Sequence, residues 1–476
     1  MRRFLSRGRI AAAATLIAAA GTASLIGCSS VTDSLLEAQD PDLVVPETIQ
    51  NAEGALALYT GAIGRLRAAT VATITGLQEP AWLFSGLLAD EWSTSSTFIQ
   101  NDEVDQRKIK TDNGSVTNQF RALARARTAA NQALEGLRAF LPAERAKQAE
   151  MYFVRGFAEM QMAQDYCNGI PLTDAPGGVV TFGMPLPVAQ VFERAIASYD
   201  SALAFASGTD TTSVRIARAA RVGKARALLG VNKVAEAAAL VTPALAPTSF
   251  EYEITFSITG GQNAIWGQGA SARRYTVSDS LEGNARNLLV RNVIPFFSLQ
   301  DPRLPVKYTT SGAGGKDTTK SQDGFTFSRT TTLYGQLTNA AMVNGIDARM
   351  VEAEARLRAD DYIGMTAILN ALRAAPPKLG DIQLTAAQLP PLVAPLTRVA
   401  AENLFFREKA LWTFSRGQRL GDLRRLVRQY GRSVDNVYPV GTHYRGGEYG
   451  TDVNLPVPKD EEKNNPNFSG CLDRAP

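Results

Sequence analysis

The residues that could carry out enzymatic chemistry are few in this chain of 476 residues. His443 is the single histidine, so any His-based triad or His-ligated metal site would have to use it. Because Gly441, Gly446 and Gly447 surround His443, we expect it in a surface loop with a structural or solvent role. The sequence therefore favours a protein that is not an enzyme and that needs no metal.

Two further segments are similar to catalytic motifs in only part of their residues. The run Gly312–Asp317 lacks the first glycine of a phosphate-binding loop and the Ser or Thr after its lysine. We interpret it as part of an exposed loop over Thr309–Gly324. Asp102, Glu103 and Asp105 provide carboxylates, but the pair separation that a glycosidase requires cannot be read from them. We expect a solvated charged loop there, and no cofactor.

The N-terminal residues have the features of a bacterial lipoprotein signal over residues 1–27. Four arginines among the first nine residues precede the Ala-rich apolar stretch Ile10–Ile26. The tetrapeptide Leu25-Ile26-Gly27-Cys28 has the form of a lipobox, so we predict that Cys28 is lipidated. An acidic tether over 28–45 follows. The leader arginines account for the whole excess of 50 Lys and Arg over 46 Asp and Glu, which leaves no indication of nucleic-acid binding.

The two remaining cysteines, Cys167 and Cys471, would lie in an oxidising compartment after export. We predict that they form a disulfide that ties the C-terminal tail to the body. Closing so long a loop would contribute about 4–5 kcal/mol through the unfolded chain. The alternative is a pair of buried free thiols.

Binding of a sugar chain or a peptide calls for exposed flat rings beside amides and carboxylates. Four aromatic residues lie in polar or irregular segments and are our candidates for ligand binding: Trp92, Phe98, Trp266 and Tyr334. Each has an alternative role as a core aromatic. Trp82 and Trp412 lie in apolar or helical contexts, and we predict that both are core residues.

The elements that must position these residues are mainly helical. Apolar residues recur at three- and four-residue steps over 46–241 and again over 346–476, as Val191, Ala195, Tyr199 and Leu203 illustrate. Neighbouring segments form pairs of the length of tetratricopeptide hairpins, with alanines at positions that suit close packing. We therefore predict a mainly α body, 46–476, of tetratricopeptide-like helical hairpins.

Residues 242–345 interrupt this helical pattern. From Phe250 to Ile258, apolar residues alternate with polar ones such as Glu251 and Glu253, which is the period of a half-buried strand. From Gly260 to Gly345 the chain is rich in Gly, Ser, Thr and Asn. We expect a loop-rich insert with a few short strands.

The C-terminal third contains an ordered series of short motifs. They are Asp301-Pro302-Arg303, Leu372-Arg373, Arg407-Glu408-Lys409, Gly417-Gln418-Arg419, Asp422-Leu423-Arg424-Arg425, Leu455-Pro456-Val457-Pro458 and Asn465-Pro466-Asn467. The series resembles the SusD/RagB family of outer-membrane nutrient-binding lipoproteins, and the resemblance covers nearly all of the mature chain in order. One departure is Arg416, which stands where the family usually has an acidic residue. We interpret the motif residues as structural.

The resemblance implies a lipid-anchored protein of the outer membrane that faces the cell exterior. It implies a looped face that binds an oligosaccharide or similar oligomeric nutrient, and a TonB-dependent transporter as partner. The alternatives are the capture of peptide rather than glycan, and a helical scaffold that only organises an outer-membrane complex.

Overall fold

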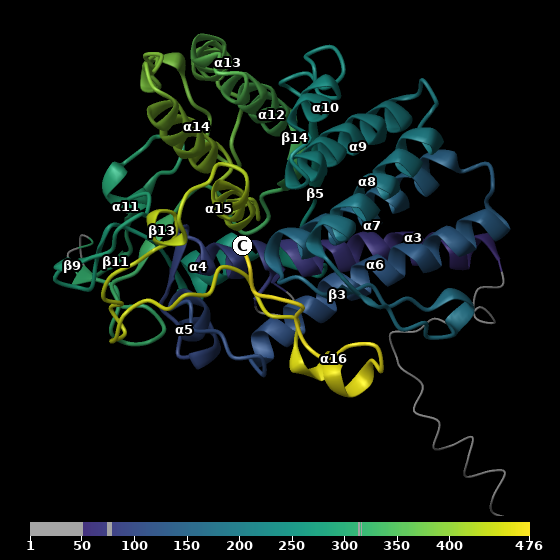
Figure 1. The fold of residues 1–476 in the computed structure, drawn as a ribbon, viewed down its shortest axis with the longest axis horizontal. Coiled ribbons are helices and arrows are strands. Elements are labelled where there is room, and N and C mark those ends of the chain that lie inside the picture. The colour runs from purple at the N-terminus through teal and green to yellow at the C-terminus, as the bar shows by residue number, and fades with distance from the viewer. Residues whose placement is uncertain (1–50, 74–78, 313–314, 316) are drawn as a thin grey trace, which may run out of the picture. The chain divides into compact units, whose positions relative to one another are not determined.

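The computed structural model describes residues 51–73, 79–312, 315 and 317–476 (Figure 1), so the leader, Cys28 and the tether lie outside the described residues. The protein is mainly α, as the sequence predicts. Its helices are α3 (Ala52–Thr70), α4 (Ala81–Leu88), α5 (Ile99–Asp105), α6 (Gly114–Phe140), α7 (Arg145–Asp165), α8 (Val188–Phe205), α9 (Thr211–Gly230), α10 (Val234–Ala239), α11 (Phe296–Leu299), α12 (Gly345–Arg358), α13 (Tyr362–Ala374), α14 (Arg398–Trp412), α15 (Arg419–Arg428) and α16 (Lys459–Asn464). None of the helices in the described ranges is long and apolar enough to cross a membrane.

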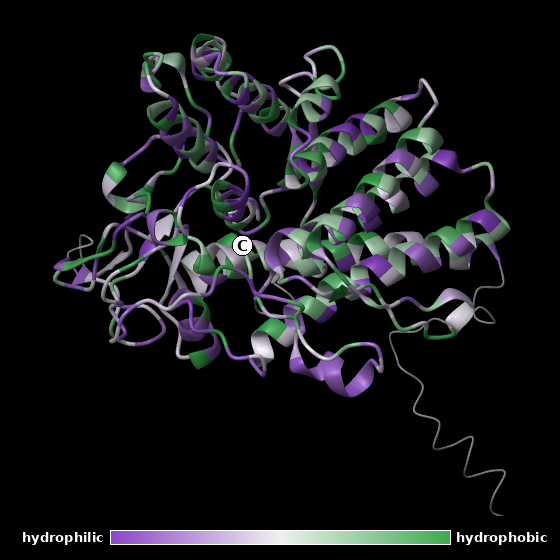
Figure 2. Cartoon of the chain, in the orientation of Figure 1, coloured by the Kyte–Doolittle hydropathy of each residue, from purple (hydrophilic) through white to green (hydrophobic). Residues whose placement is uncertain are grey.

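The long helices pack in sequential pairs, which is the arrangement that the hairpin pattern predicts. Helix α3 lies along α6, α7 lies along α8, and α8 lies along α9 (Figure 1). Small residues permit the close approach: a Cβ at Gly223 of α9 would lie 2.5 Å from the Tyr199 ring of α8. The predicted packing positions Ala195 and Ala219 are fully buried. In contrast, α16 is hydrophilic and has no buried residue (Figure 2).

Side-chain caps fix where several of these helices begin. Asn113 accepts the N–H groups of Ser115 and Val116 at the start of α6, and Asn344 forms a reciprocal capping box with Asp347 at the start of α12. Each cap satisfies backbone donors that the first helical turn leaves without a partner.

The strands are short and pair two by two. They are β1 (Ala72–Thr73), β2 (Trp92–Thr94), β3 (Ile170–Pro171), β4 (Pro185–Leu186), β5 (Glu251–Ile254), β6 (Gln262–Asn263), β7 (Tyr275–Val277), β8 (Leu281–Glu282), β9 (Leu288–Leu289), β10 (Val306–Tyr308), β11 (Thr310–Ser311), β12 (Asp317–Thr318), β13 (Arg329–Thr331) and β14 (Ala340–Asn344). The pairs are β1–β6, β2–β7, β3–β4, β5–β14, β8–β9, β10–β13 and β11–β12. Short helices of other types are the 3₁₀ turns η2 (Pro176–Gly178), η4 (Ala386–Gln388) and η5 (Val434–Asn436) and the π-helix η3 (Ile265–Ser271).

Two sequence predictions about the insert need correction. The strand predicted over Phe250–Ile258 is only β5, because its partner β14 pairs with no residue beyond Ile254, and Ile258 is 75 % exposed. The segment Thr309–Gly324, predicted to be a plain loop, contains the pair β11–β12. The glycine-rich run lies between these two strands, and part of it lies outside the described residues.

The motif residues behind the family resemblance meet in a buried ionic network. Glu408 of α14 accepts hydrogen bonds from Arg303 and Arg373, and Lys409 pairs with Asp422 at 2.6 Å. Asp422 also pairs with Arg425 at 3.2 Å. Segments far apart in the sequence are therefore joined by charged groups that satisfy one another, which agrees with the structural role predicted for them.

Cys167 and Cys471, the pair predicted from the sequence, are joined by a disulfide. Cys167 follows α7, and its backbone N–H donates to the Leu455 carbonyl, while Asn168 donates from its side chain to Asp473. The bridge and these hydrogen bonds hold the C-terminal tail against the helical body.

Candidate functional site

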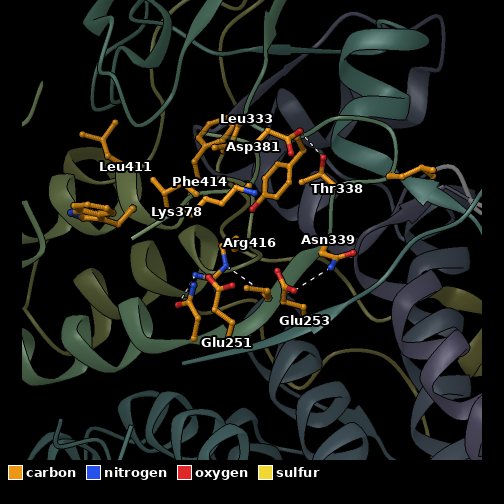
Figure 3. A pocket seen from close by; sticks show the side chains of 17 residues that line it. Glu251, Glu253, Leu333, Thr338, Asn339, Lys378, Asp381, Leu411, Phe414 and Arg416 are labelled. Atoms are coloured by element: carbon orange, nitrogen blue, oxygen red, sulfur yellow. Dashed lines mark hydrogen bonds between the residues drawn. The ribbon is translucent and has the colours of Figure 1, made fainter. Parts of the chain in front are cut away.

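A cavity of about 420 Å³ lies where β5 and β14 meet two loops and the end of α14 (Figure 3). The residues that line it share a mixture of charged, amide and apolar side chains: Glu251, Glu253, Leu333, Tyr334, Leu337, Thr338, Asn339, Ala341, Asn344, Lys378, Leu379, Gly380, Asp381, Leu411, Trp412, Phe414 and Arg416. We call it the β5–β14 cavity. Its volume falls within the range of small-ligand sites.

Strand alternation places two carboxylates in this cavity. On β5, Tyr252 and Ile254 are buried in the core, whereas Glu251 and Glu253 are exposed on the other face. Successive side chains of a strand point to opposite faces, so residues two apart share one face. Asn339 donates to Glu253 at 3.2 Å, and Figure 3 shows Glu251 and Glu253 side by side below Arg416.

The loops that close the cavity are held by Asp381. Its carboxylate accepts the Gly335 N–H at 2.7 Å and the Thr338 hydroxyl at 2.5 Å (Figure 3). Gly380 has a φ of 52°, and a Cβ there would lie 2.1 Å from the Leu333 carbonyl oxygen. Only glycine fits this close approach, so the residue fixes where Lys378 and Asp381 stand.

Arg416, the departure from the family pattern, lies against the inner end of the cavity. Its guanidinium donates to both Asp347 carboxylate oxygens, at 3.0 and 2.8 Å, and to the Ala341 carbonyl at 3.1 Å. Burial and the Arg416 charge act in opposite directions on Asp347, and the net result is a lowered pKa. This bidentate pair neutralises Arg416 and leaves it a structural role.

Three polar groups in the cavity have no partner among the described residues. They are the Tyr334 hydroxyl, the Lys378 ammonium and the Glu251 carboxylate. Tyr334 is 6 % exposed, and burial raises its pKa to about 12, so the hydroxyl is a neutral donor at physiological pH. Burial and the nearby Glu253 raise the pKa of Glu251. Groups of this kind are available to a ligand.

The arrangement suits non-covalent binding of a polyhydroxylated molecule. Carboxylates accept hydrogen bonds from hydroxyls, whereas Lys378 and Tyr334 donate to them. Leu333 and Leu337 supply apolar surface, and Leu337 is 42 % exposed. Within the described ranges, no cluster of three or more His, Cys, Asp or Glu side chains is arranged to hold a metal ion.

A second hollow, of about 530 Å³, lies among the ends of α3, α7, α8 and α9. Its charged groups are used internally: Lys147 pairs with Glu144 at 2.5 Å, and Asp210 caps α9 by accepting from Ser213. It is larger than the β5–β14 cavity but offers fewer free polar groups, so we do not take it as the site.

Of the predicted ligand-binding residues, Trp92 is a core residue, which corrects the prediction. It is 1 % exposed, its indole N–H donates to Ser415 at 3.0 Å, and its ring packs against Tyr275 and Phe414. Both faces of the ring are therefore covered by protein. Trp82 and Trp412 are also core residues, as predicted.

Of the other three predicted aromatics, one lines the cavity and two do not. Tyr334 lines the β5–β14 cavity. Phe98 is half-buried beneath Arg274, whose guanidinium lies 4.5 Å from the ring centre, and Trp266 is half-buried in η3. Sequence reasoning missed Phe325, which is 54 % exposed.

Phe98 and Phe325 belong to adjoining loops. Ser96 donates to Gln322 at 3.3 Å, and the Asp323 N–H donates to the Ser95 carbonyl at 3.1 Å. We call the surface formed by residues 95–98 and 321–327 the Phe98–Phe325 face.

His443 and Asp105 are buried, and Asp102, Glu103 and Asp105 belong to the helix α5 rather than to a loop, which corrects two further predictions. His443 is 1 % exposed, and its Nε2 lies 3.2 Å from the carboxylate of Asp105, itself 3 % exposed. The glycine-rich segment around His443 packs on α5, and Tyr444 donates to the Thr94 carbonyl. Of the residues predicted to be a solvated loop, Asp105 is therefore part of a packed polar cluster, whereas Asp102 and Glu103 are half-buried.

Comparisons with known proteins bear on the fold. No protein-family model matches the sequence, and no curated protein gives a significant sequence match. Solved structures do match. A SusD-like carbohydrate-binding protein from Bacteroides fragilis has a TM-score of 0.63 at 14 % identity and covers 89 % of this chain and 100 % of its own. Surface glycan-binding protein A from Bacteroides uniformis gives a TM-score of 0.60 at 13 % identity, and the match covers 88 % of this chain and 99 % of that one.

A SusD superfamily protein from Bacteroides vulgatus gives a TM-score of 0.59 at 14 % identity, and the match covers 89 % of this chain and 99 % of that one. Such alignments span the helical hairpins and the loop-rich insert together, in agreement with the ordered motifs of the sequence. The chain therefore has the fold of the SusD superfamily.

Proposed function

We propose that this protein is a surface lipoprotein that binds an oligosaccharide without covalent chemistry and passes it to a partner transporter. The observation that carries the proposal is the β5–β14 cavity, in which Tyr334, Lys378 and Glu251 have no partner among the described residues. Three of the structural neighbours are carbohydrate- or glycan-binding proteins by name, which supports glycan as the ligand class.

The direct test is calorimetric titration of the purified mature protein with a panel of neutral and charged oligosaccharides. We expect Tyr334→Phe to weaken binding about 2- to 10-fold, because it removes one hydrogen bond worth about 0.5–1.5 kcal/mol. Tyr362→Phe is the matched control, since that hydroxyl bonds Asp360 at 2.7 Å outside the cavity. Failure of every glycan to bind would refute the proposal.

The lipid anchor is proposed from Cys28 and its lipobox. Cys28→Ser should move the protein from the membrane fraction to the soluble fraction and abolish incorporation of a clickable palmitate analogue. Retention of label after the substitution would show that Cys28 is not the lipidated residue.

A protein partner is supported by exposed apolar residues on α13, in the segment before α14 and in the first turn of α14. Ile363, Val393, Leu396 and Val399 are 77 %, 87 %, 96 % and 64 % exposed. The start of this segment is fixed, because the Asn370 side chain both donates to and accepts from the Leu392 backbone. Exposed apolar groups presented in this way are typical of protein contacts.

We propose that a TonB-dependent transporter covers these exposed apolar residues. Leu396→Ser should reduce co-purification of an outer-membrane barrel from native membranes without changing glycan affinity. If the barrel binds the chain normally but no glycan or peptide binds, the alternative of a helical scaffold is correct.

A further inference from the structure

The β5–β14 cavity contains more negative than positive charge. Glu251, Glu253 and Asp381 line it with no ion pair among the described residues, and Lys378 is the single lining cation that is not already paired. Asp381 uses one oxygen to hold the loop, and Glu253 accepts only from the neutral Asn339. The two β5 carboxylates share one face, with Cα atoms about 7 Å apart.

The nearby cations offset this charge only in part, because burial and Glu253 raise the pKa of Glu251 by more than Arg416 and Lys378 lower it. Arg416 is neutralised by its bidentate pair with Asp347, at 2.8 Å for the closer contact. Arg226 lies behind that pair, is 4 % exposed, donates to the Met342 carbonyl and does not line the cavity. Repulsion between Glu251 and Glu253 is therefore left for a ligand to relieve.

We propose that the cavity selects a glycan unit that carries a primary ammonium group, a hexosamine without its N-acetyl group, with the ammonium between Glu251 and Glu253. This inference rests on the glycan binding proposed above and names its substrate class. A –NH₃⁺ group has three donors, which matches two carboxylates and one further acceptor. Hydrogen bonds to charged groups are about twice as strong as neutral ones.

The remaining groups suit the hydroxyls of the same sugar. Tyr334 lines the cavity and is 6 % exposed, and its hydroxyl has no partner in the described structure. The hydroxyl is therefore placed to form a hydrogen bond with a substituent of the sugar ring. Lys378 also lines the cavity and can donate to hydroxyl oxygens of the same sugar, although its charge acts on Glu251 as well. A lysine side chain by itself has no oxygen that could accept a hydrogen bond from these two donors.

The experiment is calorimetric titration of the mature protein at pH 6 with four probes: the β-1,4-linked trimer of glucosamine, its triacetylated counterpart, cellotriose and trilysine. We expect the glucosamine trimer to bind at least about tenfold more tightly than each of the other three. Glu253→Gln and Glu251→Gln should each remove most of that preference. The matched control is Glu193→Gln on α8, where the glutamate is exposed and outside the cavity. This variant should keep the preference for the glucosamine trimer.

Equal binding of the acetylated and free trimers would overturn the inference, as would tighter binding of trilysine or an ammonium preference that survives both glutamine variants. If all three sugar trimers fail while another glycan binds at the cavity, the ammonium inference is wrong and the glycan function stands. If no glycan binds in any form, the proposed function itself fails.

Discussion

The β5–β14 cavity and the Phe98–Phe325 face differ in how their polar groups are used. On the Phe98–Phe325 face, Arg445 pairs with Asp323 at 2.9 Å, and Asp323 also accepts two backbone N–H groups and the Thr326 hydroxyl. In the cavity, Tyr334 and Lys378 have no partner in the described chain. The Phe98–Phe325 face is distinguished by an exposed ring, whereas the β5–β14 cavity is distinguished by polar groups that have no hydrogen-bond partner.

This difference shows why exposure alone is a weak guide to a ligand site. A polar group that a protein has already satisfied gains little from a ligand, whereas an unsatisfied one in a concave site gains a full hydrogen bond. We therefore expect the cavity to dominate ligand affinity and the aromatic face to contribute little.

The largest effect that we predict concerns Trp92, which lies behind the aromatic face. Trp92→Ala should destabilise the protein by about 3–5 kcal/mol, because it leaves a large void beside Tyr275 and Phe414. Denaturant unfolding measures this. A loss below about 1 kcal/mol would mean that the ring belongs to the surface after all.

The second prediction concerns the pH dependence of stability and Glu79, which accepts a hydrogen bond from Tyr275, a neighbour of Trp92. Burial raises the pKa of Glu79 to about 7, although hydrogen bonds from Tyr275 and Asn101 oppose the shift. The folded state therefore binds the proton more tightly than the unfolded state. The free energy of unfolding should therefore fall by about 3 kcal/mol through this group as the pH rises from about 4.5 to about 7.

The control for this pH dependence is Glu79→Gln, which keeps the shape of the side chain but cannot titrate. Thermal unfolding as a function of pH should show a shallower decline in the variant. Parallel curves for the two proteins would contradict the assignment.

The third prediction sharpens the account of the cavity. Gly380→Ala should cost about 1–3 kcal/mol in stability, because the residue has a positive φ and its Cβ would meet the Leu333 carbonyl. The displaced loop should also weaken glycan binding. Gly431→Ala is the matched control, since its φ is 69° but its Cβ would meet nothing within 4 Å. Equal loss of glycan affinity in both variants would show that the close approach at Gly380 does not position the site.

The smallest effect belongs to the aromatic face. Phe325→Ala should change stability by less than about 0.5 kcal/mol and glycan affinity by less than about twofold, because the ring is 54 % exposed and outside the cavity. Titration of this variant beside Tyr334→Phe compares the two regions directly. If Phe325→Ala lowered glycan affinity more than Tyr334→Phe does, the aromatic face rather than the cavity would be the main binding region.

Features with local causes could be predicted from the sequence. The four-residue ladder of α8 follows from helical periodicity, and the Cys167–Cys471 disulfide follows from counting cysteines in a chain that the sequence predicts to be exported. The alternation at β5 even placed Glu251 and Glu253 on one face before any contact was known.

Features that depend on distant segments could not be predicted. The polar neighbours of Trp92 indicate a surface position, but Ser415, 323 residues away, takes its N–H. The glycines around His443 indicate a loop and say nothing of Asp105, which packs against it. The cavity itself joins β5 to Lys378 and α14, and no local pattern brings these together.

The most direct test of the central claim is a crystal structure of the mature protein soaked with the tightest-binding oligosaccharide from the panel. Our account predicts ligand density in the β5–β14 cavity, within hydrogen-bond distance of the Tyr334 hydroxyl and the Glu251 carboxylate. Density stacked on Phe325 with an empty cavity would contradict it.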